Sequence, residues 1–78
     1  MNLLEIQRIY AIHKLFALHN KVNSKILAER LNISRATVFR GLATLKKIGA
    51  PICYNYTTKT HYYEANFRLS LEDLVNKL

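Results

Sequence analysis

The side chains best suited to binding chemistry lie in one short stretch, from Ser34 to Lys47, where cations and hydroxyls recur every three or four residues. Arg35 and Arg40 each carry a planar guanidinium that can make two-point hydrogen bonds to guanine O6 and N7 or to a phosphate. Thr37 adds a hydroxyl and a methyl group. On a helix, this spacing places the groups on one face. The stretch therefore has the chemistry of a nucleic-acid contact surface.

This stretch lies in the second of two short helices that the sequence predicts over residues 24–48. Apolar side chains at helical spacing are expected to hold the two helices together: Ile26, Leu27, Leu31, Ile33, Val38, Leu42, Leu45 and Ile48. Asn23 or Ser24 is the expected cap of the first helix, and Asn32 suits a left-handed backbone at its end. Ser34 is the expected cap of the second helix, which ends at Gly49. A helix pair with a tight turn and a basic outer helix fits the major groove of DNA.

A longer helix precedes this pair. Its predicted span is Leu3 to Leu18, with Asn2 as the N-cap. Its expected apolar face consists of Leu4, Ile6, Ile9, Ile12, Leu15 and Phe16. Val22 lies in the break that follows and is compatible with a very short strand. The sequence thus predicts a core of three helices.

After Pro51 the helical periodicity gives way to the alternation typical of β-strands. Residues 52–56 and 61–65 are aromatic-rich alternating runs around Thr57-Thr58-Lys59-Thr60, so they predict a hairpin with a four-residue loop. Lys59 is expected at the exposed tip of this hairpin. The tyrosines are expected mostly to pack against the helices, and the pattern leaves open which of Tyr62 and Tyr63 points inward.

A short C-terminal helix is predicted over residues 71–78, with Ser70 at its start in a capping-box arrangement. The expected fold is mainly α with a small β-hairpin. It forms a single domain over residues 1–78, with the helix pair at 24–48 and a two-stranded wing at 52–65. This order of elements is that of a winged helix-turn-helix.

Composition narrows the possible classes of protein. The 78 residues suffice for one small domain, and half of them are hydrophobic, which argues against disorder. A single cysteine, Cys53, allows neither an intrachain disulfide nor a cysteine zinc cluster. The apolar N-terminal stretch is interrupted by charged and polar residues, so it resembles neither a signal peptide nor a membrane span. A cytoplasmic, nucleoid-associated location is the default expectation.

The formal net charge of +7 is concentrated on the helix pair. Residues 20–48 contain seven basic side chains and one acid, Glu29. A polyanion is the natural partner of such a surface, because neutralising phosphates releases counterions. The alternative is a basic face that is merely solvated.

The run LAERLNISRATVFRGLATLKKIGAPI, from Leu27 to Ile52, carries a family resemblance. Its order of Ala-Glu-Arg-Leu, Ile-Ser-Arg, Thr-Val-Phe-Arg and Gly-Ala-Pro-Ile resembles the N-terminal domain of DeoR-like and WYL-domain bacterial transcriptional regulators. The resemblance extends from about Gln7 to Ala65. It implies a winged helix-turn-helix whose third helix enters the major groove and whose wing lies along the neighbouring minor groove or backbone.

Two departures from that family matter. The family usually carries an acid just after the arginine of the recognition helix, where this chain has Gly41. A glycine inside a helix costs roughly 1 kcal/mol relative to alanine. It permits either a close approach of another helix or a helix that deforms before DNA binds. The effector-sensing domain of the family does not follow here, so no small-molecule effector is expected.

The predicted contacts with double-stranded DNA divide into two sets. Base edges are the expected targets of Arg35, Ala36, Thr37 and Arg40. Phosphates are the expected targets of Lys25, Ser34, Thr44, Lys46, Lys47 and, in the wing, Lys59. For Arg40, a phosphate contact or an intramolecular salt bridge is the alternative, and for Arg35 base and phosphate are equally compatible. Phe39 is more compatible with packing than with reading bases.

The sequence gives no support for catalysis, a metal or a cofactor. Its three histidines, His13, His19 and His61, lack metal-ligand spacing, and no acidic pair is expected to face inward. Cys53 fits a small packing residue better than a reactive thiol.

These features together predict a sequence-specific DNA-binding transcriptional regulator, a small repressor or autoregulator acting by operator occupancy. A winged-helix protein–protein adaptor or inhibitor is the alternative from another class, and a replication or recombination accessory factor shares the same chemistry. A domain this small offers few base contacts, so a homodimer on a two-fold operator is expected. The expected dimer surfaces are the first helix and the stripe of Leu71, Leu74, Val75 and Leu78, although this stripe is equally compatible with intramolecular core.

Overall fold

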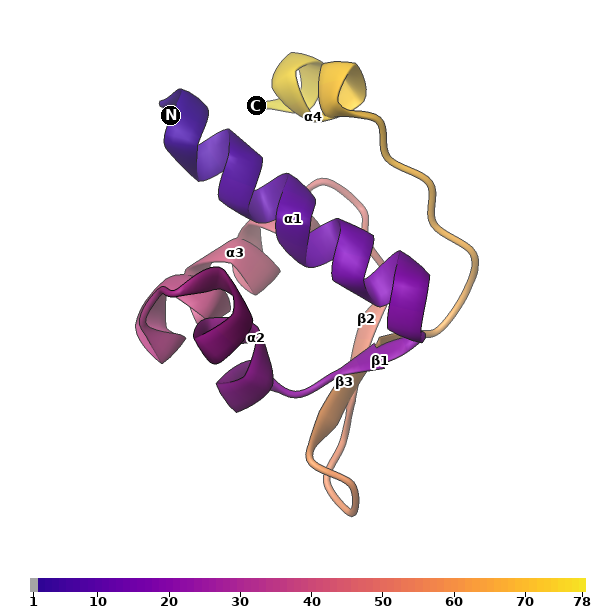
Figure 1. The fold of residues 1–78 in the computed structure, drawn as a ribbon. Helices are drawn as coiled ribbons and strands as arrows, with labels where there is room; N and C mark the ends of the chain where they lie inside the picture. Colours follow the sequence, from indigo (N-terminus) through magenta and orange to yellow (C-terminus); the bar gives the residue numbers. More distant parts are fainter. Residues whose placement is uncertain (1) are drawn as a thin grey trace.

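The computed structural model describes residues 2–78, in which helices form the body and a hairpin projects from it (Figure 1). The helices are α1 (Leu3–His19), α2 (Ser24–Leu31), α3 (Arg35–Lys47) and α4 (Leu71–Lys77). The strands are β1 (Lys21–Val22), β2 (Ile52–Asn55) and β3 (Thr60–Tyr63). This is the predicted winged helix-turn-helix order, with the short strand expected at Val22.

Side-chain oxygens fix where each helix begins. The caps are Asn2 for α1, Asn23 for α2, Ser34 for α3 and Ser70 for α4, and each accepts a hydrogen bond from a backbone N–H of the first turn. The structure thereby chooses Asn23 over Ser24 as the cap of α2. Asn20 and Asn32 end α1 and α2 in the left-handed conformation, with φ of 63° and 54°. The polar residues between the apolar runs therefore begin and end the helices as predicted.

The core lies where α1 crosses the helix pair. Its main members are buried apolar side chains from every helix: Ile9, Ile12, Phe16, Leu27, Ala28, Val38, Leu42, Leu45 and Leu74. Two residues expected in the core are instead 53% exposed. Leu4 is one residue off the stripe through Ile9, Ile12 and Phe16, which continues to position 5. Ile26 precedes the buried pair Leu27–Ala28 and so lies on the outer side of α2.

Gly41 marks the closest approach between α1 and α3. A Cβ atom added to this buried glycine would lie 2.6 Å from Cδ1 of Ile12, which is 1% exposed. Carbon atoms in ordinary contact are about 3.5–4.0 Å apart, so the space is already occupied. Of the two roles that the sequence allows for Gly41, the structure shows the close helix approach.

The strands form one antiparallel sheet in the order β1-β3-β2. Asn55 pairs with Thr60, so the hairpin loop covers residues 56–59 and the prediction of 57–60 was wrong by one residue. The reason lies in Asn55, whose Oδ1 accepts from the N–H groups of Thr57 and Thr58 and so begins the turn earlier. Lys59 remains at the tip with φ of 57°.

The register decides which hairpin tyrosines face the core. Tyr63 is opposite Ile52 and stacks on Phe16 with 4.3 Å between ring centroids, so it is the inward tyrosine. Tyr62 points to the other face of the sheet. Tyr54, Tyr56 and Tyr62 are all exposed, contrary to the expectation that most tyrosines pack against the helices. The hairpin extends beyond the body, so the helices cover only its base (Figure 1).

The C-terminal helix α4 packs beside the first turns of α1, which brings the two ends of the chain to one side of the molecule (Figure 1). Leu74 is 0% exposed and belongs to the core, so its assignment to a dimer surface was wrong. Its neighbours Leu71, Val75 and Leu78 are between 41% and 49% exposed. The stripe therefore divides into one core residue and an outer apolar face.

Candidate nucleic-acid interface

A row of hydrogen-bonded side chains runs along the outer face of α3. Ser34 Oγ accepts from the N–H of Thr37 at 3.1 Å, and the two hydroxyl oxygens lie 2.9 Å apart. Arg40 Nη2 donates to Thr37 Oγ1 at 3.0 Å. The predicted base-edge residues Thr37 and Arg40 are thus brought together, and the guanidinium keeps its other donors for a ligand. Ala36 and Ala43 are exposed on the same face.

Arg35 lies at the start of α3 and reaches across to α2. Its Nη2 donates to Oγ of Ser24 at 3.2 Å, and Ser24 is buried. The guanidinium therefore joins the first turns of the two helices, next to the exposed Lys25. Positive side chains and the free N–H groups of a helix start favour a phosphate at such a place. Arg35 is accordingly separated from the row that ends in Arg40.

The far end of α3 carries the remaining predicted phosphate contacts. Lys46 and Lys47 are exposed, whereas Thr44 is half-buried and its Oγ1 donates to the carbonyl oxygen of Arg40 at 3.1 Å. That bond leaves the Thr44 oxygen able to accept but not to donate. Thr44 is therefore a poorer phosphate ligand than the two lysines, because a phosphate oxygen needs a donor.

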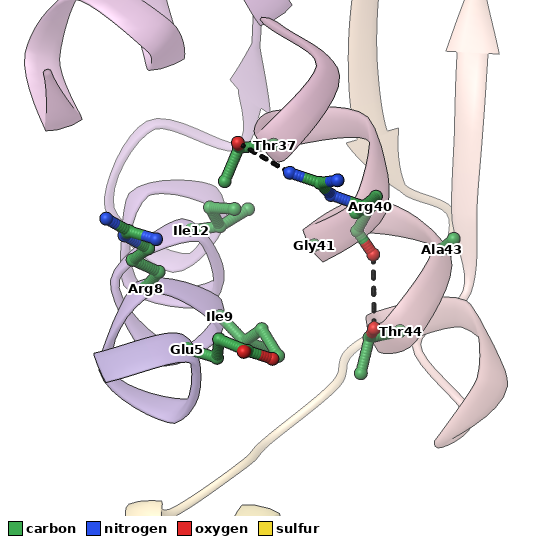
Figure 2. Close-up of a pocket in the computed structure, with 9 residues that line it drawn as sticks. All are labelled: Glu5, Arg8, Ile9, Ile12, Thr37, Arg40, Gly41, Ala43 and Thr44. Carbon is green, nitrogen blue, oxygen red and sulfur yellow. Dashed lines mark hydrogen bonds between the residues drawn. The ribbon is translucent and has the colours of Figure 1, made fainter. Parts of the chain in front are cut away.

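A groove separates the outer face of α3 from α1. Figure 2 shows it lined by Glu5, Arg8, Ile9 and Ile12 of α1 and by Thr37, Arg40, Gly41, Ala43 and Thr44 of α3. Ile12 and Gly41, which make the close contact between the two helices, both line this groove. An exposed helix face that carries a row of donors is suited to a DNA major groove.

The wing is joined to the start of α2 by one side chain. Asn23 Oδ1 caps α2 by accepting from the N–H groups of Lys25 and Ile26, and Asn23 Nδ2 donates to the carbonyl oxygen of Lys59 at 3.0 Å. The bond places the wing tip beside the helix that supports α3. The backbones of Lys25 and Lys59 are thus both bonded to the Asn23 side chain, and their exposed side chains carry positive charge on the helix pair and on the wing.

The comparison with protein families agrees with this geometry. The model of the HTH domain family matches residues 8–53, which is more than half of the chain. The chain belongs to the HTH domain family. No curated protein and no solved structure matched in the corresponding searches. The protein is therefore a DNA-binding regulator with a winged HTH domain, whereas its assignment to the DeoR-like or WYL subtype stays a prediction.

The match to the HTH domain covers most of α1, all of α2 and α3, and the beginning of β2. The structure adds β3 and α4, which complete the wing and cover α1. Within residues 2–78, no helix has the length and hydropathy that crossing a bilayer requires. No group of three or more His, Cys, Asp or Glu side chains in the same residues is arranged to hold a metal ion.

Two histidines of the described chain, His13 and His61, are buried. His13 Nδ1 lies 2.9 Å from the hydroxyl oxygen of Tyr63, and burial, with a smaller effect of Lys14, lowers the pKa of His13. Burial also raises the pKa of Tyr63. Burial and then Lys46 lower the pKa of His61. Both imidazoles thus favour the neutral form, as packing residues do.

Cys53 lies on the outer face of the sheet. Its Sγ donates to Glu64 Oε2 at 3.5 Å. Desolvation and this carboxylate raise the pKa of the thiol. A raised pKa disfavours the nucleophilic thiolate, which fits the packing role expected for Cys53.

Sequence reasoning missed the residues that orient the HTH domain. Ser24 and Asn23 were recognised only as caps, although Ser24 also binds Arg35 and Asn23 also binds the wing. Phe39 was expected to be partly buried, and it is 46% exposed with its ring 6.2 Å from that of His61. These hydrogen bonds and this ring contact join residues far apart in the sequence, so no local sequence pattern predicts them.

Proposed function

We propose that this HTH protein is a sequence-specific transcriptional repressor that acts by occupying an operator in double-stranded DNA. The observation that carries the proposal is the row of Ser34, Thr37 and Arg40, whose hydrogen bonds organise the exposed face of α3 before any DNA is present. Such preorganisation reduces the entropy lost on binding. The role needs no chemistry beyond binding and places the protein on the nucleoid in the cytoplasm.

The cations around this row supply affinity for any sequence. Lys25 on α2, Lys59 on the wing and Lys47 at the end of α3 are all exposed. Their contacts with phosphates position the protein, while Arg40 reads base edges. The proposal therefore assigns sequence selectivity to Arg40 and affinity for DNA of any sequence to the three lysines.

The test begins with selection of a preferred duplex from random DNA, followed by titration of that duplex and of an unrelated one. Arg40→Ala is expected to lose about 5- to 150-fold affinity for the selected duplex and much less for the unrelated one. Lys47→Ala is expected to weaken both equally and to reduce the salt dependence by about one counterion.

Lys14→Ala is the matched control, because it removes the same charge from α1, where Lys14 lies 5.9 Å over the Tyr10 ring. It is expected to change neither selectivity nor affinity beyond the small effect of net charge. If selection yields no preferred sequence, the repressor role is refuted and the protein–protein adaptor becomes the better hypothesis.

The dimer that we propose uses the exposed face of α4. Leu71, Val75 and Leu78 are apolar and exposed. About a two-fold axis at Val75, Val75 of one copy meets Val75 of the other, and the exposed Leu71 and Leu78 of both copies flank the axis. An isologous interface requires such self-complementarity.

The dimer has its own test. Light scattering is expected to give twice the monomer mass for the native chain and the monomer mass for Val75→Glu, because a carboxylate pair would be buried on the axis. Lys14→Glu, which makes an exposed change on α1, is expected to stay dimeric. A native chain that is monomeric both free and on DNA refutes the dimer.

A further inference from the structure

Four rings form a continuous row from the recognition helix to the wing tip. The ring centroids of Phe39 in α3 and His61 in β3 are 6.2 Å apart. The centroid of His61 is 4.6 Å from that of Tyr54 in β2, which is 4.8 Å from that of Tyr56 in the loop. The strand register pairs Tyr54 with His61, so both project from the same face of the hairpin. We call these residues the aromatic row.

The aromatic row is buried at one member and exposed at the others. His61 is 9% exposed, whereas Tyr54 is 38%, Phe39 46% and Tyr56 84% exposed. Tyr56 contacts the rest of the row through the edge-to-face pair with Tyr54, at an interplanar angle of 85°. Contiguous exposed aromatic surface on a soluble domain marks an interaction site more often than a structural one. The free faces of Tyr56 are thus available to an occupant.

The charges beside the row identify the class of that occupant. Lys46 is close enough to His61 to disfavour its protonation, and Lys59 lies in the same loop as Tyr56. Glu64 is engaged on the opposite face of the sheet, where it accepts from Cys53. Rings bordered by cations suit nucleic acid, because bases stack on the rings while phosphates meet the ammonium groups.

The faces of paired bases are covered by their neighbours in a duplex, so a tyrosine can stack only on bases that are unpaired or unstacked. From this we propose that the aromatic row, with Tyr56 as its outermost ring, is a stacking platform for unpaired bases next to the duplex bound by α3. The proposal rests on the DNA binding proposed above. It adds that the protein prefers DNA in which a short segment beside its site is open.

The experiment compares the native protein on a selected duplex, on the same duplex with mispaired bases beside the site, and on the single strand. We expect the mispaired duplex to bind about 5- to 150-fold more tightly than the paired one for each base that stacks. A 2-aminopurine placed among the mispaired bases is expected to change its fluorescence when the protein binds. Equal affinity for paired and mispaired duplex would overturn the proposal.

Variants then assign the preference to the row. Tyr56→Ala is expected to abolish the preference and the fluorescence change while leaving affinity for the paired duplex nearly unchanged, and Tyr56→Phe to retain both. Tyr62→Ala, on the other face of β3, is the matched control and is expected to behave as the native chain. Tyr56 is so exposed that its removal is expected to leave the melting temperature unchanged, which circular dichroism checks. A preference that survives Tyr56→Ala would overturn the assignment.

The outcomes also separate this inference from the proposed function. Selective binding to the paired duplex without any preference for mispaired DNA overturns the stacking platform alone, and leaves the row to a protein partner. Absence of binding to every DNA overturns both. Stronger binding to the mispaired duplex that depends on Tyr56, together with selectivity that depends on Arg40, supports both.

Discussion

Replacing Gly41 by alanine tests how α1 positions the recognition helix. The added Cβ would lie 2.6 Å from Ile12 Cδ1, and Ile12 is enclosed by the core. Alanine gains about 1 kcal/mol in helix propensity, whereas forcing a methyl group into a packed core costs about 1–3 kcal/mol. We therefore expect Gly41→Ala to destabilise the protein by up to about 2 kcal/mol, although the same change in an open helix would stabilise it.

A second substitution isolates this contact. Ile12→Val removes the Cδ1 atom and costs about 0.5–1.5 kcal/mol when made alone. In the double variant, the alanine Cβ occupies the space that Cδ1 leaves, so the overpacking disappears and the gain in propensity remains. The double variant is expected to lie within about 1 kcal/mol of the native chain, which gives a coupling energy of about 1–3 kcal/mol.

Urea unfolding followed by circular dichroism gives the free energy of unfolding of the native chain, the two single variants and the double variant. The comparison holds when their m-values agree. Gly49→Ala is the matched control, because a Cβ there meets nothing within 4 Å and the strain comes only from the φ of 106°. Its effect is expected to add to that of Ile12→Val. Additivity of Gly41→Ala and Ile12→Val within about 0.5 kcal/mol would refute the close contact as the role of Gly41.

Two further predictions concern stability. Asn23→Ala is expected to lower the free energy of unfolding by about 1–2 kcal/mol. Asn23→Ser is expected to lower it less, because serine retains the cap of α2 and loses only the bond to Lys59. Urea unfolding measures both variants, and equal losses of stability would contradict the capping role of Asn23. Since the folded pKa values of His13 and His61 lie below the ordinary value of 6.5, the unfolded chain takes up protons first as pH falls. The stabilising contribution of each neutral histidine is therefore fully present above about pH 6.5. At lower pH the free energy of unfolding decreases by at most about 1.4 kcal/mol per pH unit for each histidine. Melting temperatures across this range check the slope, which His13→Gln is expected to reduce.

The parts of the fold that the sequence predicted well depend on neighbours along the chain. Caps at Asn2, Ser34 and Ser70 act within three residues of their partners, so their side-chain type is enough to locate them. The outer face of α3 follows from the spacing of Val38, Leu42 and Leu45 in the same way. The family resemblance reinforced these elements and implied that the hairpin, already predicted from its alternation, serves as a wing along the DNA.

The wrong predictions concern edges of elements, where tertiary contacts decide. Leu4 and Ile26 have apolar side chains near the helical pattern, but no element covers them. Leu74 and Val75 are adjacent and similar in type, yet only Leu74 faces the core. Periodicity gives the direction of a side chain on its own helix, and it cannot tell how far the neighbouring element extends.

The interface illustrates the same limit from the functional side. Arg40 and Thr37 could be placed on one surface from their spacing alone, whereas the aromatic row required the register of β2 against β3 and the packing of the hairpin on α3. A shift of the pairing by one residue would turn Tyr54 and His61 to opposite faces of the sheet and break the row. The hydrogen bond from Asn23 to Lys59 is a long-range contact between the wing loop and the start of α2, so it also constrains where the proposed stacking residue Tyr56 lies relative to α3. The residues proposed to read paired bases are thus placed by local sequence, and those proposed to capture open bases are placed by the tertiary fold.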